Sequence, residues 1–278
     1  MRIYQIYEEI RLLRNMLQVV FFHSHPLISA TLALMIKKLF LFLFISSITV
    51  SVSAQLESKA QSFFSPRYTF QIPGGDMSDR FGLNSSLGLT FATKKENGNY
   101  FGVNGNYQFG SDVKEPGLIQ NLLSINNEII SVEGKPASVL IQQRGFNFSI
   151  DFGKFMRFKK SKNESGILVT IGTGFIQHNI RFEHQLDDIP QLDGEYEKGY
   201  DRLSNGLMLS QNIGWLFFSK KRFGDFYLGL ELIEALTFSR REYNFDTLTS
   251  DQGDARLDLL FGIKAGWAVP FYKKNLYD

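Results

Sequence analysis

The sequence contains no cysteine. Disulfide bonds, thiolate metal sites and lipid attachment at an N-terminal cysteine are therefore excluded. An excess of one charge is also missing, because 30 Lys and Arg nearly balance 28 Asp and Glu and leave a formal net charge of +2. This balance gives no reason to expect a nucleic-acid partner. After residue 54 there is no apolar run of the roughly 20 residues that a membrane-spanning helix needs.

A secretory signal is present, but it lies inside the chain. Met35-Ile36-Lys37-Lys38 is basic, residues 39–45 are apolar, and small residues lead to a break after Ala54. This order is typical of a signal peptide. The alternative is a transmembrane anchor, for which the apolar run is too short. We therefore expect residues 35–54 to be a signal peptide and residues 55–278 to be the exported domain.

Residues 1–34 precede this signal, although signal peptides stand at the N-terminus. We expect a mis-assigned upstream start, with Met35 as the true first residue. The alternative is a genuine extension of 34 residues, and the helix-like apolar spacing of residues 3–17 carries no function in either case.

Apolar and polar residues alternate along the exported domain. In one segment Phe101, Val103 and Tyr107 share a face, while Asn104 and Asn106 share the other. A period of two predicts β-strands. Eight segments show it: 61–72, 82–94, 99–111, 143–158, 166–182, 204–219, 226–244 and 255–272.

The segments and their links indicate a membrane barrel. Several segments reach the roughly 9–11 residues that a tilted membrane-spanning strand needs, and short basic links alternate with long ones. Lipid cannot satisfy an open sheet edge, so the sheet has to close. We therefore predict an all-β fold, a closed antiparallel up-and-down transmembrane β-barrel of about 8 strands in the cell outer membrane. Both ends of the barrel domain would be periplasmic.

Aromatic residues gather near the ends of the predicted strands. Girdles at the two membrane interfaces would explain them, and ordinary core packing is the alternative. The residues are Tyr68, Phe70, Phe91, Tyr100, Phe101, Phe155, Phe158, Trp215 to Phe218, Phe226, Tyr227, Trp267 and Phe271.

Residues 55–278 resemble the small eight-stranded outer-membrane barrels, the group with the OmpA membrane domain and the OmpW-like proteins. The resemblance rests on pattern and topology. The stretches from Pro73 to Gly82 and from Gly199 to Gly206 are similar to signatures of an uncharacterised barrel family of the Bacteroidota type. The resemblance implies no established activity.

An eight-stranded barrel is just wide enough for side chains to fill its interior. Residues of both charge signs stand at inward positions, and they predict a network of paired polar side chains in the lumen. A proton or ion path through the same residues is the alternative. The predicted lumen network consists of Arg67, Asn104, Asn106, Asp151, Glu231, Asp258 and Lys264, and Gln71 and Asn212 are further inward positions.

His178 is the one candidate for catalysis. It is expected to face inward near the outer rim, with Glu183 and two aspartates close behind. A lipid A hydrolase or acyltransferase could use such a histidine with a serine. No Gly-x-Ser-x-Gly motif supports this, and a hydrogen-bonded rim histidine is the alternative. The acidic residues 183–202 do not have EF-hand spacing, so neither a metal nor a cofactor is predicted.

The sequence alone leaves three hypotheses for the function open. The first hypothesis is a non-enzymatic barrel with a structural or accessory role, such as a subunit of a larger outer-membrane assembly. The alternatives are a narrow channel for small or hydrophobic solutes and a lipid A-modifying enzyme that uses His178. Expected partners are outer-membrane lipid, lipopolysaccharide and outer-membrane proteins. The long link 112–142 is expected to fold over the barrel mouth, with partner docking as the alternative.

Overall fold

A computed structural model describes residues 60–158, 164–184, 187–218, 225–250 and 252–271. The predicted signal peptide and the residues before it lie outside this range. In the described part no helix is long and apolar enough to cross a membrane.

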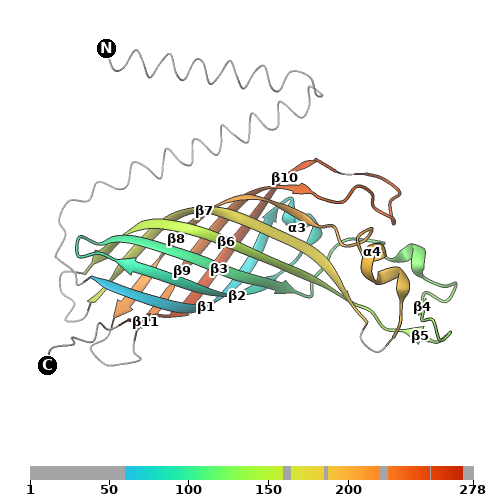
Figure 1. The fold of residues 1–278 in the computed structure, drawn as a ribbon, viewed down its shortest axis with the longest axis horizontal. Helices are drawn as coiled ribbons and strands as arrows, with labels where there is room; N and C mark the ends of the chain where they lie inside the picture. The colour runs from blue at the N-terminus through green and yellow to red at the C-terminus, as the bar shows by residue number, and fades with distance from the viewer. Residues whose placement is uncertain (1–59, 159–163, 185–186, 219–224, 251, 272–278) are drawn as a thin grey trace, which may run out of the picture. The chain divides into compact units, whose positions relative to one another are not determined.

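Eight long strands make up the sheet, and each joins its sequence neighbour in antiparallel pairing (Figure 1). They are β1 (Gln61–Gly75), β2 (Asn84–Lys94), β3 (Asn99–Gly110), β6 (Leu140–Arg157), β7 (Glu164–Glu183), β8 (Ser204–Phe218), β9 (Phe226–Ser239) and β10 (Ala255–Trp267). A two-residue strand, β11 (Val269–Pro270), continues β10 along β1.

The sheet closes on itself. β10 pairs with β1 from Arg67↔Gly266 to Gly75↔Asp258, so first and last strands share a seam. Closure removes the edges that lipid could not satisfy. The predicted fold class, a closed antiparallel up-and-down barrel of eight strands, is confirmed.

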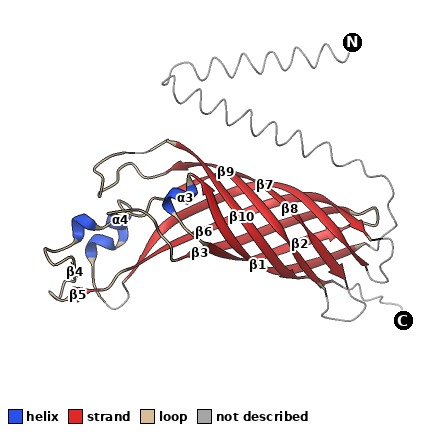
Figure 2. Ribbon diagram, turned by 180° about the vertical axis from the view of Figure 1, so that it is seen from behind, coloured by secondary structure: helices blue, strands red, loops and turns tan. Residues whose placement is uncertain are grey.

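The links differ at the two ends of the barrel. We call the end with the long links the loop end and the opposite end the turn end (Figure 2). The loop end carries helix α3 (Met77–Arg80), the 3-10 turns η1 (Gln120–Leu122) and η2 (Pro190–Leu192), helix α4 (Gly194–Glu197) and a small hairpin of β4 (Ile129–Ile130) and β5 (Pro136–Ala137). β1 begins at the turn end.

Strand boundaries agree with the alternating pattern, with one clear error. The pattern extended the seventh segment to residue 244, but the corresponding strand, β9, ends at Ser239. Arg240 and Arg241 instead bond to Asn205 and to the loop residue Asp201. A run of polar residues has no apolar face to hold it in the sheet, so the chain leaves the barrel there.

Candidate functional site

The centre of the barrel interior is polar and paired. Lys264 on β10 forms an ion pair with Glu231 on β9, and its Nζ also donates to Asn212 Oδ1 over 3.1 Å. Asn212 Nδ2 in turn donates to Thr170 Oγ1 over 3.2 Å. All four residues are buried. A buried ammonium needs such partners, because an unpaired charge away from water is strongly unfavourable.

A second group of hydrogen bonds surrounds Asp151 on β6. Its Oδ1 accepts from Ser149 Oγ at 2.8 Å and from Ser210 Oγ at 3.3 Å. Ser149 Oγ also accepts from Asn104 Nδ2 at 3.1 Å. This group connects β3, β6 and β8 across the lumen. The carboxylate is held by hydroxyl donors.

Arg67 and Asn106 complete the predicted set. The Arg67 guanidinium lies 4.9 Å from the ring centroid of Tyr227, where the ring face attracts a cation. Asn106 Nδ2 donates to Asn147 Oδ1 at 2.8 Å. The structure thus places all seven predicted residues on inward strand positions. That they act together in a function stays a prediction.

Asp258 belongs to a separate cluster at the loop end. Its Oδ1 accepts from Arg80 Nη2 at 2.6 Å, and its Oδ2 lies 2.9 Å from His178 Nε2 and 2.6 Å from Thr237 Oγ1. Arg80 comes from α3, which folds into the barrel mouth. The carboxylate is 1% exposed, so its charge is balanced almost entirely by protein groups.

His178 lies inward near the loop end. Asp258 gives it the carboxylate partner that a catalytic histidine would require. Ser204 is its register partner on β8, but the Ser204 hydroxyl donates to the Arg202 carbonyl and accepts from Arg80 and Arg256. His178 is 0% exposed, and the ring of Phe81 packs edge-on against it at 5.5 Å. In this conformation no substrate could reach the imidazole.

A hydrophobic cluster fills the mouth above these groups. Inward strand residues such as Ile176 and Leu260 meet residues from three of the long links. The buried link residues are Met77, Phe81, Leu118, Ile129, Ile189, Leu192 and Tyr200. The link 112–142 therefore folds over the mouth. Its exposed apolar residues Ile125 and Val132 remain at the surface.

Ion pairs fasten the loops to one another. Arg202 pairs with Asp246 at 2.6 Å and lies 3.7 Å from Glu115. Because these three residues belong to three different long links, their contacts join those links. Arg241 forms a two-pronged ion pair with Asp201. The guanidinium of Arg202 and the carboxylate of Asp246 are each only 6% exposed. These contacts hold the long links over the barrel mouth in one arrangement.

Glu197, in α4, has a raised pKa. Partial burial is the main cause, and the charge of Asp201 adds to it, while a hydrogen bond from the Phe182 backbone opposes it. No group of three His, Asp or Glu in the described ranges could hold a metal ion. Within this acidic loop Glu183, Glu195 and Asp201 form ion pairs with arginine or lysine side chains.

The turn end holds a second hydrophobic cluster, and it corrects part of the girdle prediction. Tyr100, Phe155, Phe218 and Tyr227 point inward and are buried, as is Phe63. Their sequence neighbours Phe101 and Phe226 face outward, as strand alternation requires. The other aromatics predicted for the girdles that are exposed are Tyr68, Phe70, Phe91, Phe158, Trp215, Trp267 and Phe271, and Phe217 occupies an outward position beside buried Leu216 and Phe218.

The inward aromatics fit because glycines lie beside them. A Cβ added at Gly229 would come within 2.5 Å of Tyr227 Oη, and one at Gly102 within 2.8 Å of Tyr100 Oη. Lys94 is buried among the same rings, with its Nζ 4.8 Å from the centroid of Phe155. Lys94, the last residue of β2, thus faces the lumen.

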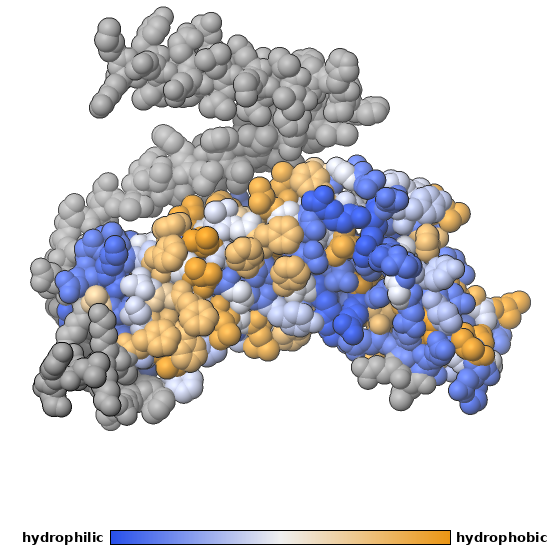
Figure 3. Space-filling view, viewed as in Figure 1, coloured by the Kyte–Doolittle hydropathy of each residue, from blue (hydrophilic) through white to orange (hydrophobic). Residues whose placement is uncertain are grey.

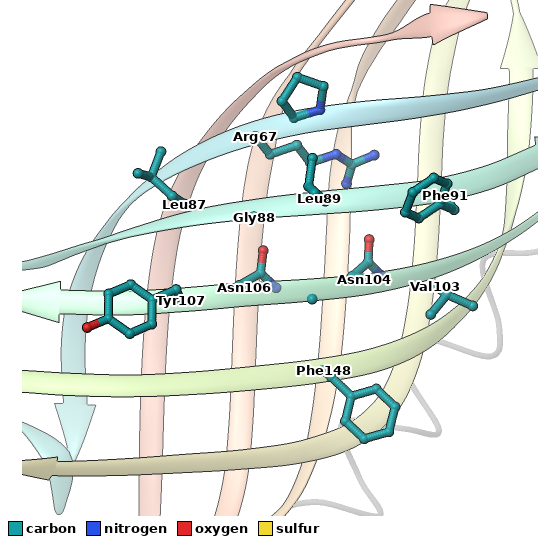
Figure 4. A pocket seen from close by; sticks show the side chains of 12 residues that line it. Arg67, Leu87, Gly88, Leu89, Phe91, Val103, Asn104, Asn106, Tyr107 and Phe148 are labelled. Atoms are coloured by element: carbon teal, nitrogen blue, oxygen red, sulfur yellow. The ribbon is translucent and has the colours of Figure 1, made fainter. Parts of the chain in front are cut away.

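The outer wall is apolar. Figure 3 shows hydrophobic side chains over the middle of the barrel wall and hydrophilic residues at the loop end. One groove in this wall, of about 780 Å³, is lined by residues of β1, β2, β3 and β6 (Figure 4). At one of its lining residues, Gly105, an added Cβ would meet nothing within 4 Å. Its apolar lining includes Leu89, Phe91, Val103 and Phe148. An apolar outer face on a closed sheet suits lipid, so the architecture agrees with the predicted outer-membrane localisation.

Sequence reasoning missed Arg80 as a lumen residue. It assigned the stretch to a link, and nothing in the alternating pattern indicates that a link residue enters the barrel. The available signal was the inward charge of Asp258, for which the sequence pattern offered no partner, together with an arginine in the distinctive stretch 73–82.

Comparison with known proteins yields structural likeness alone. No family model matches the chain. No curated protein matches it either. Among solved structures, Neisserial surface protein A is similar with 9% identity and a TM-score of 0.41, over 77% of this chain and 100% of that one.

Two further similar structures are bacterial barrels. Ail of Yersinia pestis, in complex with the heparin analogue sucrose octasulfate, has 10% identity and a TM-score of 0.36, over 76% of this chain and 99% of its own. The N-terminal β-barrel domain of Pseudomonas aeruginosa OprF has 8% identity and a TM-score of 0.34, with the same coverages. The ring closure of this chain's own strands makes it an eight-stranded barrel, and the apolar outer face of that barrel, rather than these distant likenesses, fits the outer-membrane type.

Proposed function

We propose that the chain is a closed outer-membrane barrel that does not conduct solutes and acts as a structural or accessory subunit through its outward surfaces. The observation that carries this is the filling of the interior at three levels. Aromatics occupy the turn end, paired charges occupy the centre, and loop residues cover the mouth. With the interior occupied, the outer wall and the loop surface are the parts left to act.

The channel alternative requires a continuous tunnel of low charge. The described interior instead holds three charged centres, at Asp151, at the Lys264–Glu231 pair and at Asp258 with Arg80. Moving a solute through it would require breaking buried ion pairs, which is strongly unfavourable. The enzyme alternative requires an accessible His178, and this ring is buried beneath Phe81.

Conductance measurement tests the proposal. The purified barrel is inserted into planar bilayers, with a trimeric porin as the open reference and a Tyr100→Ala/Phe155→Ala variant as a matched barrel with a thinned turn end. We expect no stable unitary steps from the natural chain. Reproducible steps at low voltage would overturn the closed-barrel proposal and favour the channel.

A further inference from the structure

Two polar side chains stand on the lipid-facing wall where apolar residues are expected. Gln211 on β8 and Glu234 on β9 both occupy outward positions, since their neighbours Ser210, Asn212 and Ile233 are buried inward. Gln211 Nε2 donates to Glu234 Oε1 over 3.3 Å. Both side chains remain partly exposed on the outer wall.

The nearest outward neighbours of this pair, along the strands and directly across the ladders, are apolar. Along the strands the next outward residues are Leu209, Ile213, Leu232 and Leu236, and across the ladders they are Ile171 and Leu259. Gln211 lies four positions from the outward Trp215 at the turn end. With a rise of about 3.3 Å per residue and a tilt of about 40°, it stands ~10 Å from that level, inside an apolar band about 25 Å tall.

A carboxyl group at this depth requires an explanation. Ionisable residues facing lipid are unfavourable and usually mark a contact with another group. The intramolecular bond uses one N–H of Gln211 and one oxygen of Glu234. Among the described residues, none bonds the second N–H of the Gln211 amide or Glu234 Oε2. The pair thus presents one donor and one acceptor toward the membrane.

We propose that this face of β8 and β9 binds a second copy of the chain. A patch with one donor and one acceptor is self-complementary under a two-fold rotation, as an isologous interface requires. All copies insert in the same orientation, so the axis lies along the membrane normal and groups of equal depth face each other. Gln211 of each copy then donates to Glu234 of the other, and the leucines around them pack together.

The inference rests on the proposed function, because it names the partner of a barrel that acts through its outer wall. Its test is independent of conductance. A closed barrel that stays monomeric would overturn the dimer alone, and a conducting dimer would overturn the closed barrel alone.

The absence of cysteine makes cross-linking a clean test. Leu230→Cys lies on the proposed face and is 58% exposed before substitution. Leu87→Cys is a matched control at 55% exposure on β2, three strands away from β9 around the ring. Each single-cysteine chain is oxidised in its native outer membrane. We expect a disulfide-linked species of twice the chain mass from Leu230→Cys, at least tenfold more abundant than from Leu87→Cys.

Variants of the polar pair separate a specific contact from crowding. Glu234→Leu in the Leu230→Cys background should lower the cross-linked fraction about tenfold while the barrel keeps its heat-dependent gel mobility. The exchange Gln211→Glu/Glu234→Gln keeps one donor and one acceptor and should retain cross-linking. Equal yields on both faces, no effect of Glu234→Leu, or a cross-link to a protein of another mass would each overturn the proposal.

Discussion

The substitution Asp258→Asn removes one buried charge from the loop-end cluster and keeps the side-chain volume. In the natural chain this carboxylate accepts from Arg80 at 2.6 Å, from Thr237 at 2.6 Å and contacts His178 at 2.9 Å. The amide leaves the buried Arg80 guanidinium without its counter-ion. Removing one partner of a buried ion pair typically costs about 3–5 kcal/mol, so we expect the free energy of unfolding to fall by that amount.

Urea unfolding in phospholipid vesicles measures the loss. Trp215 and Trp267 are the two tryptophans, and both face outward, so their emission reports the transfer from lipid to water. The matched control is Glu133→Gln, which removes an acid from an ion pair with Lys135 in which both side chains are at least 70% exposed. Such surface pairs contribute about 0–1 kcal/mol. If Asp258→Asn changed stability no more than Glu133→Gln, the charge balance assigned to the cluster would be wrong.

Three further results are expected. Lys264→Met should destabilise the barrel by about 3 kcal/mol or more, because it leaves the buried Glu231 carboxylate without its counter-ion. In the same urea assay Lys264→Met/Glu231→Met should recover most of that loss. If the losses of the two single variants simply added in the double variant, the pairing would be contradicted. Gly105→Leu should leave the heat-dependent gel mobility intact, because a Cβ at Gly105 meets nothing within 4 Å. Gly174→Leu should abolish it, because a Cβ at Gly174 comes within 1.8 Å of the Phe148 carbonyl oxygen. Equal behaviour of the two variants would refute the outward position of Gly105 and the inward position of Gly174. Glu197 has a raised pKa in the folded chain, so its ionised form destabilises the folded loop as pH rises through that pKa. Glu197→Gln should therefore slow proteolysis of the link 184–203 at neutral pH and give no such protection in acid. Equal protection at both pH values would contradict this titration.

Strand alternation predicted most of the barrel because a pleated strand in a barrel wall has only two environments. Once Phe101 is assigned to lipid, Asn104 and Asn106 are assigned to the lumen by parity alone. The same rule assigns Tyr100 inward. It was nevertheless grouped with the girdle because an aromatic near a strand end suits either face by composition. The choice depends on space made by Gly102, which only the packed interior reveals.

Links were predicted less well for a physical reason. Their side chains are not constrained by a ladder, so no period indicates which of them enter the barrel. The contact between Arg80 and Asp258 joins positions 178 residues apart, and local spacing carries no information on such a pair. The loop-end cluster therefore required the folded chain, whereas the inward charges themselves did not.

The seam between β1 and β10 also has a consequence for how the barrel is made. Besides its ladder, the first link reaches across it: Asp76 bonds the Leu257 backbone through both its own N–H and its carboxylate, and Arg80 holds the next residue, Asp258. These bonds need both ends of the exported chain, so they form only after every intervening strand has been synthesised and paired. Since contacts of such long sequence separation form slowly, sealing of the seam should be a late kinetic step. A nascent barrel waiting for its last strand would expose two open edges, which makes this interval the one in which assistance by other proteins matters most.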